Sequence, residues 1–486
     1  MTDPSLRSLS HAVDGRVIVK YLGMLSLSLA AMAAVPAAVA AALGEVTAAE
    51  RYASVFAVLL LAGFLGSRRA AAADIQINEG LVIVALTFIL GALVMTWPFM
   101  SAGLSLIDAL FEAVSGLTTT GLSTLPSVEH MPASFLFTRS WLQWYGGLVI
   151  IVVALAVIIG PSAGARRLAV DEGDAAEGVA STRMRARSVL KVYVALTLAG
   201  IVLTWLAGAT PTDALIHTLS AISTGGFSNH DASAGGLGAP AAATVSLISL
   251  IGAISLSLQA SAIRNPRLLW SDGEVRAIVA VVLLTAAALM ACMSAKSGLS
   301  LGGIGEALFL AVSSQTTSGF ALTPIAALAP AAKLVLIFSM LIGGDMGSTA
   351  GGIKIFRLLV IGRVLQLLLV RTCIANHAVV TPRVAGRIVG DEEIRVACGI
   401  VAAYAAVILV SWFVFVAWGL APLDALFDVV SAAATVGLST GVTSASLPAA
   451  LKGLLCIDML MGRLEIIAVL VLVYPRTWLG RRAARP

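Results

Sequence analysis

The chain has 486 residues, of which 59% are hydrophobic and 12% are charged, and its mean hydropathy is +0.98. Soluble domains carry about 25% charged residues, so this composition excludes a water-soluble globular protein. The formal net charge of +5 would suggest nucleic-acid binding in a soluble chain. Here it follows from the placement of basic loops around membrane spans, and no nucleic-acid partner is expected.

Apolar runs close to the roughly 20 residues of a membrane helix recur along the whole chain. The run at 330–370 is too long for one span and is interrupted by glycines. These runs predict an all-α polytopic membrane protein, and ten crossings, an even number, fit a chain with both termini on one side of the membrane. We place ten spans, at residues 17–42, 51–67, 80–98, 136–160, 189–209, 241–263, 276–294, 330–370, 394–419 and 450–474.

Charge predicts the orientation of these spans. Most of the 31 Lys and Arg residues fall in the loops on one side and in both termini. Because loops rich in Lys and Arg stay in the cytoplasm, both termini are expected to be cytoplasmic. Two cations, Lys354 and Arg463, lie within apolar sequence, where charges are costly and usually functional. The opposite side holds only Arg51, Arg139, Lys296, Lys333 and Lys452.

An internal repeat is the most informative feature of the sequence. Four segments align without gaps, each beginning with an acid followed by Ala-Leu. In every copy a serine, a threonine and a glycine follow the acid at the same spacing. The simplest interpretation of one copy is an ordinary loop helix capped by Thr and Gly, but four copies in register favour re-entrant pore helices. The segments begin at Asp108, Asp213, Glu306 and Asp424.

The chemistry of each repeat suits a cation. The acid is expected at the N-cap or first turn, where it offsets the positive end of the helix dipole. The partly negative end then points into the membrane. Glycine permits the positive φ of a turn, and non-helical backbone survives at membrane depth only when it is buried or lines a water-filled path. Four such stretches around one axis would form a ring of carbonyl oxygens that replaces the hydration shell of an ion.

At these residues the sequence resembles the potassium-uptake superfamily of bacterial TrkH, TrkG and KtrB subunits and plant HKT transporters, and is most similar to TrkH. Further matching segments are QWYGGLVIIVVALAV from Gln143, GGDMGSTAGGIKIFR from Gly343 and MGRLEIIAVLVLVYPRTW from Met461. The resemblance implies two N-terminal helices (residues 1–70) and four helix–pore-loop–helix repeats in pseudo-fourfold arrangement around one pore. These repeats are expected at 71–165, 166–270, 271–375 and 376–486.

The resemblance also implies a selectivity filter for K⁺. Family members with serine at the first filter glycine tend to pass sodium, whereas this chain has glycine in all four repeats, which favours potassium. The implied ion-binding residues are Thr118, Thr119, Thr120 and Gly121; Ser223, Thr224, Gly225 and Gly226; Thr316, Thr317, Ser318 and Gly319; and Ala434, Thr435, Val436 and Gly437.

The third inner helix is expected to break between residues 343 and 352, because each glycine in a helix costs about 1 kcal/mol. Asp345 stands where the family usually has a small uncharged residue, so it either attracts cations or pairs with a basic neighbour. Arg463 would be a positive barrier below the filter, or would form an ion pair with Asp458 or Glu465. The resemblance assigns a gate to Gly343, Gly344, Asp345, Gly347, Ser348, Thr349, Gly351, Gly352, Lys354 and Arg463.

Two further acids, Glu112 and Asp428, occupy the same aligned position in the first and fourth repeats. The second repeat has His217 at that position. They are expected to form local hydrogen bonds behind the filter, with an outer vestibule as the alternative.

Together these features predict potassium uptake across the bacterial cytoplasmic (inner) membrane. A sodium-passing or weakly selective cation pore of the same fold is the alternative. No enzymatic activity is expected, because the five scattered histidines supply no catalytic cluster. The resemblance implies K⁺ as the transported ion, no organic cofactor, a homodimer in membrane lipid, and a cytoplasmic TrkA-like nucleotide-binding regulatory subunit.

Overall fold

The computed structural model describes residues 12–69, 75–157, 174–297, 300–373, 382–385 and 387–479. Within these ranges the protein is helical, as predicted, apart from one antiparallel pair of two-residue strands, β1 (Arg383–Val384) and β2 (Arg387–Ile388). The predicted repeat boundaries after residues 70, 165 and 375 lie outside the described residues.

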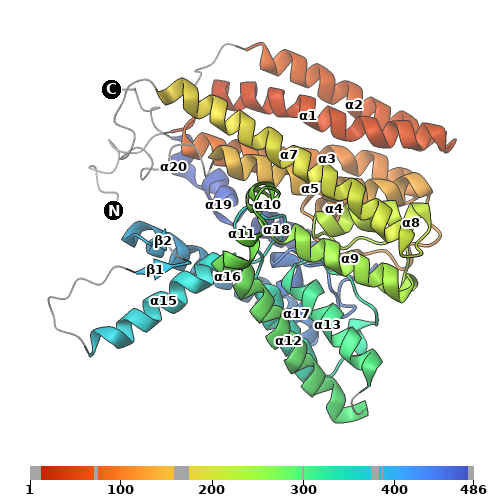
Figure 1. Ribbon diagram of the computed structural model, residues 1–486. Helices are drawn as coiled ribbons and strands as arrows, with labels where there is room; N and C mark the ends of the chain where they lie inside the picture. Colours follow the sequence, from red (N-terminus) through yellow and green to blue (C-terminus); the bar gives the residue numbers. More distant parts are fainter. Residues whose placement is uncertain are drawn as a thin grey trace.

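Two N-terminal helices, α1 (Gly15–Ala42) and α2 (Val46–Ser67), lie side by side along one flank of the molecule (Figure 1). Glycines allow their close approach. A Cβ on Gly23 would lie 2.6 Å from the backbone nitrogen of Ser67, and one on Gly66 would lie 2.9 Å from the Cα of Gly23. Each of these helices is long and apolar enough to cross a membrane.

The rest of the chain repeats one pattern four times: an outer helix, a short pore helix and an inner helix. The first repeat contains α3 (Ile77–Phe99), η2 (Met100–Ala102), α4 (Leu106–Leu117) and α5 (Ala133–Val157). The second contains α7 (Asp174–Leu206), α8 (Pro211–Ile222), η3 (Ser233–Gly236), α9 (Ala239–Gly252), α10 (Leu256–Ala262) and α11 (Arg267–Ser271).

The third repeat contains α12 (Gly273–Ser297), α13 (Leu301–Gln315), η4 (Ile325–Ala327), α14 (Pro330–Leu341) and α15 (Ile355–Arg371), followed by the β1–β2 pair. The glycine-rich loop (residues 342–354) separates α14 from α15, which confirms the predicted break. The fourth repeat contains α16 (Asp391–Ala417), α17 (Pro422–Ala433), α18 (Ala449–Arg463), α19 (Ile467–Val473) and α20 (Pro475–Trp478).

Local chemistry begins each pore helix. The Ser105 hydroxyl accepts a hydrogen bond from the Asp108 N–H, the Thr210 hydroxyl accepts one from Asp213, and α17 starts at a proline. The acid lies in the first turn of three pore helices, as predicted. In the third repeat this prediction is wrong, because α13 is capped earlier by Ser300 and Glu306 falls in the second turn.

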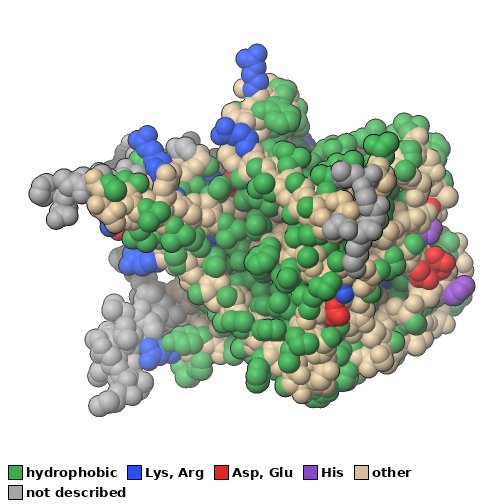
Figure 2. Space-filling view, turned by 90° about the horizontal axis from the view of Figure 1, so that it is seen from below, with side chains coloured by type: hydrophobic (Ala, Val, Ile, Leu, Met, Phe, Trp, Pro, Cys, Tyr) green, Lys and Arg blue, Asp and Glu red, His purple; other side chains and the backbone are tan. Residues whose placement is uncertain are grey.

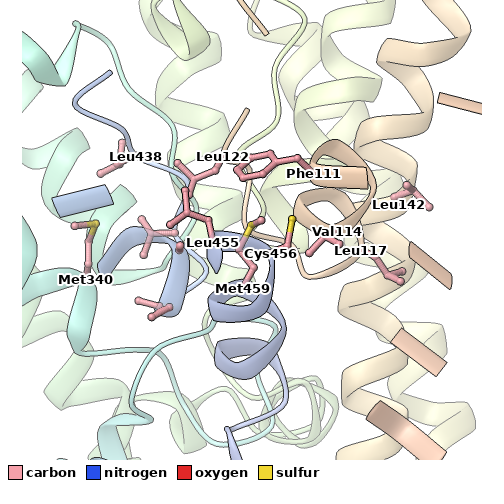
Figure 3. Close-up of a cluster of buried hydrophobic side chains, with 14 of the residues drawn as sticks. Phe111, Val114, Leu117, Leu122, Leu142, Met340, Leu438, Leu455, Cys456 and Met459 are labelled. Atoms are coloured by element: carbon pink, nitrogen blue, oxygen red, sulfur yellow. The ribbon is translucent and has the colours of Figure 1, made fainter. Parts of the chain in front are cut away.

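Packing between repeats closes a circle. Inner helix α5 packs on pore helix α8, α9 on α13, α14 on α17, and α18 on α4. The last contact joins the fourth repeat to the first. Figure 3 shows it as an apolar cluster that includes Leu455, Cys456 and Met459 of α18 and Phe111 and Val114 of α4.

The outer surface suits lipid. Six helices of the described residues are long and apolar enough to span a membrane, and the bent pair α9–α10, with an angle of 99°, would make a seventh. Figure 2 shows a broad apolar face, with Lys and Arg mainly toward one side and His at the opposite edge. The chain is a multi-pass membrane protein.

Candidate functional site

All four pore helices end in the same way. The threonine of the repeat takes a left-handed backbone, with φ of 55° at Thr119, 53° at Thr224, 55° at Thr317 and 50° at Thr435. In the first repeat the Thr120 N–H donates to the Ser115 carbonyl at 2.9 Å, and the Thr119 N–H donates to that of Gly116 at 3.0 Å. This is the Schellman arrangement, which normally uses glycine.

The left-handed region costs a non-glycine residue about 1–2 kcal/mol. Four threonines in that conformation are therefore unfavourable by themselves. Such strain persists only where the surrounding structure enforces it, and it gathers at functional sites. Two residues further on, Gly121, Gly226, Gly319 and Gly437 have φ of 87°, 79°, 70° and 97°.

The four Thr-x-Gly stretches meet in one closed ring, here called the Thr-x-Gly ring. Each glycine faces the carbonyl oxygen that precedes the glycine of the next repeat. A Cβ added to Gly121 would lie 2.1 Å from the Gly225 oxygen, and one added to Gly226 would lie 2.1 Å from the Ser318 oxygen. A Cβ on Gly319 would lie 1.9 Å from the Val436 oxygen, and one on Gly437 would lie 2.2 Å from the Thr120 oxygen. The last contact returns to the first repeat, so the four stretches surround a common axis.

Burial in the ring follows the same fourfold pattern. In each repeat the three residues before the glycine are buried, and the glycine itself is partly exposed. The residue after the glycine is again buried and fixes the stretch to the core. These anchoring residues are Leu122, Phe227, Phe320 and Leu438.

Side chains behind the ring hold its backbone. The Gln143 amide of α5 donates to the Gly225 carbonyl at 2.5 Å and accepts from the Phe227 N–H at 3.1 Å. In the third repeat the Ser313 hydroxyl donates to the Phe320 carbonyl at 2.6 Å. No local sequence signal marks this role of Gln143, because its partner lies 82 residues away.

The acids behind the ring form local bonds, as expected. Glu112 accepts from the Arg139 Nε at 2.8 Å and from the Ser123 hydroxyl at 2.6 Å. Asp428 accepts from the N–H groups of Thr440 and Thr443, each at 2.8 Å. Both acids are fully buried, so the vestibule alternative is wrong for this structure.

The glycine-rich loop lies directly against the ring. The Gly351 N–H donates to the Thr317 hydroxyl at 2.8 Å. A Cβ on Gly351 would lie 2.0 Å from the Thr435 Oγ1 and 2.4 Å from the Ala434 carbonyl oxygen. The Thr349 hydroxyl lies within hydrogen-bond distance of the Ile222 carbonyl at the end of α8, 3.1 Å away, and of the Gly252 carbonyl at the end of α9, 2.9 Å away. The loop therefore contacts the second, third and fourth repeats where their pore helices end.

The loop is also fixed at its first half. Asp345 accepts from the Ser255 N–H at 2.9 Å, and the Met346 N–H donates to Glu274 at 3.2 Å. Glu274 in turn pairs with Arg387 of β2 at 3.2 Å. Within the described ranges no basic side chain pairs with Asp345, so it stiffens the loop through a backbone bond and not through the predicted ion pair.

Arg463 lies at the end of α18 and reaches the same loop. Its guanidinium donates to the Thr349 carbonyl at 2.6 Å and to the Gly146 carbonyl at 3.3 Å. The ion-pair alternatives are not formed, because Asp458 accepts from Ser411 at 2.8 Å and Glu465 pairs with Arg357. Lys354 donates to the Ala350 carbonyl within the loop.

Two further breaks in the inner helices were not predicted. The second inner helix turns sharply between α9 and α10. The fourth breaks between α18 and α19, where Glu465 and Ile466 have φ of 54° and 64°. A positive φ at a β-branched residue is an outlier, and no glycine or proline marks the place. Among the residues that the structure describes, the first inner helix alone runs unbroken past the ring.

The chemistry available here is that of backbone oxygens. In the described part of the chain, no group of three or more His, Cys, Asp or Glu side chains could hold a metal ion. A cation on the ring axis would instead meet carbonyl dipoles. The hydroxyls of Thr119 and Thr435 are buried without a hydrogen-bond partner in the described residues.

These observations define a helical, multi-pass membrane protein built from four pore-helix repeats that close into one ring. Comparison with known proteins agrees. The family profile TrkH, described as "Cation transport protein", matches residues 48–271 and 278–478. The chain therefore belongs to the TrkH family, whose members are ion transporters and not enzymes.

Individual relatives match along nearly the whole chain. The Trk system potassium uptake protein TrkH of Vibrio parahaemolyticus is 32% identical over 95% of this chain and 99% of its own length. TrkH of Escherichia coli K12 is 31% identical over 95% of this chain and 99% of its own length. The crystal structure of the potassium transporter TrkH from Vibrio parahaemolyticus superposes with a TM-score of 0.85 at 30% identity, covering 96% of this chain and all of that one.

Proposed function

We propose that this chain takes up potassium across the bacterial cytoplasmic membrane, with the Thr-x-Gly ring as its selectivity filter. One observation supports this most strongly. Four carbonyl oxygens, one per repeat, surround a common axis at the ends of four pore helices. Carbonyl dipoles in that arrangement can replace the hydration shell of a cation, and the relatives named above are potassium uptake proteins.

The helix ends strengthen the site. Each pore helix directs its C-terminal end at the ring, and that end carries a partial negative charge of about half an electron. Four such ends raise the local concentration of cations without a formal charge. A carboxylate would bind a cation too tightly for rapid release, whereas conduction requires that binding be weak enough to let the ion leave.

The glycine-rich loop is proposed as the gate. It contacts three of the four repeats below the ring and donates a hydrogen bond to Thr317. Arg463 reaches it through the Thr349 carbonyl and adds a positive charge that opposes a cation leaving the ring. In this proposal the arrangement described above is closed, and opening requires the loop to move away.

Orientation and partners stay predictions. Cytoplasmic termini follow from the placement of basic residues. A homodimer and a TrkA-like nucleotide-binding subunit follow from the resemblance alone.

Growth of a bacterial strain that lacks its own potassium uptake tests the function. Wild-type protein should restore growth at limiting potassium. Gly226→Ser should restore it poorly, because a side chain there collides with the Ser318 carbonyl and the residue has φ of 79°. Gly453→Ser is the matched control, since a Cβ on Gly453 meets no atom within 4 Å.

Failure of wild-type protein to restore growth would contradict potassium uptake. Equal rescue by wild type and Gly226→Ser would show that the second stretch is not part of the filter. Competition of Na⁺ with Rb⁺ flux separates the sodium-passing alternative, which predicts equal block by Na⁺ and K⁺.

A further inference from the structure

A cavity of about 310 Å³ borders the glycine-rich loop and the end of α18. Its wall is mostly apolar and comes from helices far apart in the sequence. This part of the wall consists of Ile77, Leu81 and Val84 of α3, Ile150 and Ile151 of α5, and Ile467 and Ala468 of α19.

Three charged side chains also line the cavity: Lys354, Arg463 and Glu465. The charge of Glu465 is already matched, because it pairs with Arg357. Lys354 and Arg463 are 8% and 3% exposed, and neither has a carboxylate within 4.0 Å among the described residues. The cavity therefore carries two unmatched positive charges.

Both cations are only partly satisfied by the protein. Lys354 donates one hydrogen bond, to the Ala350 carbonyl. Arg463 donates to two carbonyls, but its Nε is buried without an acceptor in the described part of the chain. Buried charges are usually paired or hydrogen-bonded throughout. Two cations facing one apolar cavity thus favour an anionic occupant with an apolar body.

We propose that this cavity binds a medium-chain fatty carboxylate. Its head group pairs with Lys354 and Arg463, and its chain lies along α3 and α19. The volume is at the lower end of the range for ligand cavities, about 300–1,000 Å³, which suits a single short acyl chain and not a whole phospholipid. At the start of α3, Ile77 is 75% exposed, so the apolar wall continues to the surface of the protein.

The expected consequence is inhibition of uptake. An occupant of this cavity contacts the glycine-rich loop and α18 together, in the arrangement where the loop lies against the ring. A ligand that binds one of two conformations shifts the population toward that conformation. Bound carboxylate should therefore hold the loop in place. This effect rests on the proposed function, whereas binding itself does not.

Binding is tested first, on the full-length protein in lipid nanodiscs, with a photoactivatable decanoate analogue and peptide mapping. Label should appear on residues 77–84 or 467–468, and decanoate should displace it while decanol and decylamine do not. Ala468→Leu fills the cavity and should lower the label at least about fivefold. Ala199→Leu makes the same change on an exposed face of α7 and should keep it.

Transport is tested second, by Rb⁺ flux in proteoliposomes. Decanoate should slow the wild type and Ala199→Leu at least about threefold and leave Ala468→Leu unaffected. If Ala468→Leu does not fold, Val84→Phe replaces it, since Val84 lines the same wall.

Label spread evenly over lipid-facing helices, equal competition by decanol, or equal labelling of both leucine variants would overturn the site. Cavity labelling without any change in flux would overturn the inhibitory role. Absence of wild-type flux would count against the proposed function alone, because labelling still decides whether the carboxylate binds.

Discussion

Replacing Gly351 by alanine is the sharpest test of the proposed gate. The added Cβ would lie 2.0 Å from the Thr435 Oγ1 and 2.4 Å from the Ala434 carbonyl oxygen, whereas ordinary contact begins at 3.4 Å. The φ of Gly351 lies outside the left-handed region, so alanine adopts the same backbone without strain. The substitution therefore acts through collision alone.

The loop, and not the ring, should give way. Each stretch of the ring is fixed by the two hydrogen bonds that end its pore helix and by a buried Leu or Phe. Overpacking a tight contact costs about 1–3 kcal/mol, which corresponds to a change of about 5- to 150-fold in an equilibrium. If the closed arrangement dominates in wild type, Gly351→Ala should raise Rb⁺ uptake into proteoliposomes within that range.

The matched control is Gly362→Ala on α15, where a Cβ meets no atom within 4 Å and uptake should stay at the wild-type rate. Unchanged or lower uptake by folded Gly351→Ala would refute the reasoning, because it would show that the loop does not obstruct ions where it lies.

Three further outcomes are expected. Arg463→Ala removes a positive charge and a bond to the loop worth about 1.5–3 kcal/mol, so Rb⁺ flux should rise at least about tenfold; exposed Arg276→Ala should not change it, and lower flux in Arg463→Ala would contradict the barrier role. Arg139→Leu leaves its buried carboxylate partner unpaired at a cost of about 3–5 kcal/mol, which should lower the thermal midpoint measured by intrinsic fluorescence; an unchanged midpoint would contradict it. Burial by itself raises the pKa of the Asp231 carboxyl group. Hydrogen bonds, of which the one from the Val128 N–H has the largest effect, outweigh burial, so the pKa is lowered. A carboxyl group whose pKa is lower in the folded than in the unfolded protein stabilises the fold at pH values above its unfolded pKa. That stabilisation is lost as the pH falls through the folded pKa. The midpoint difference between wild type and Asp231→Asn should therefore be constant from neutral pH down to about 4 and shrink only in stronger acid; shrinkage already near pH 6 would disprove this assignment.

Glycines bring three of the inner helices into close contact with the pore helices. Gly146, Gly252 and Gly462 each face the carbonyl oxygen at the end of the pore helix in their own repeat, and a Cβ there would lie 1.9, 2.5 and 1.9 Å from it. In the third repeat the contact differs: a Cβ on Gly343 would lie 1.9 Å from the Gly351 carbonyl oxygen, and the Gly343 carbonyl accepts from the Gln315 side chain at 3.4 Å. The residue after each glycine is Gly147, Ala253, Gly344 and Arg463, so the pseudo-fourfold symmetry is broken by one large cation.

The sequence by itself determined the class, the family and the residues of the candidate filter. These features are local: a long apolar run predicts a span, and the Thr and Gly of each repeat predict where the pore helix ends and the chain turns. Glycine density likewise predicted the break in the third inner helix. The ion-binding role of the filter residues stays a prediction.

Tertiary structure alone decided how these pieces meet. The cyclic order of the carbonyls, the bond from Gln143 to the second stretch, and the reach of Arg463 to Thr349 join residues separated by 82 residues or more. No local pattern encodes such a partner. The break after α18 is similar, because Ile466 takes a φ of 64°, which a β-branched residue does not favour.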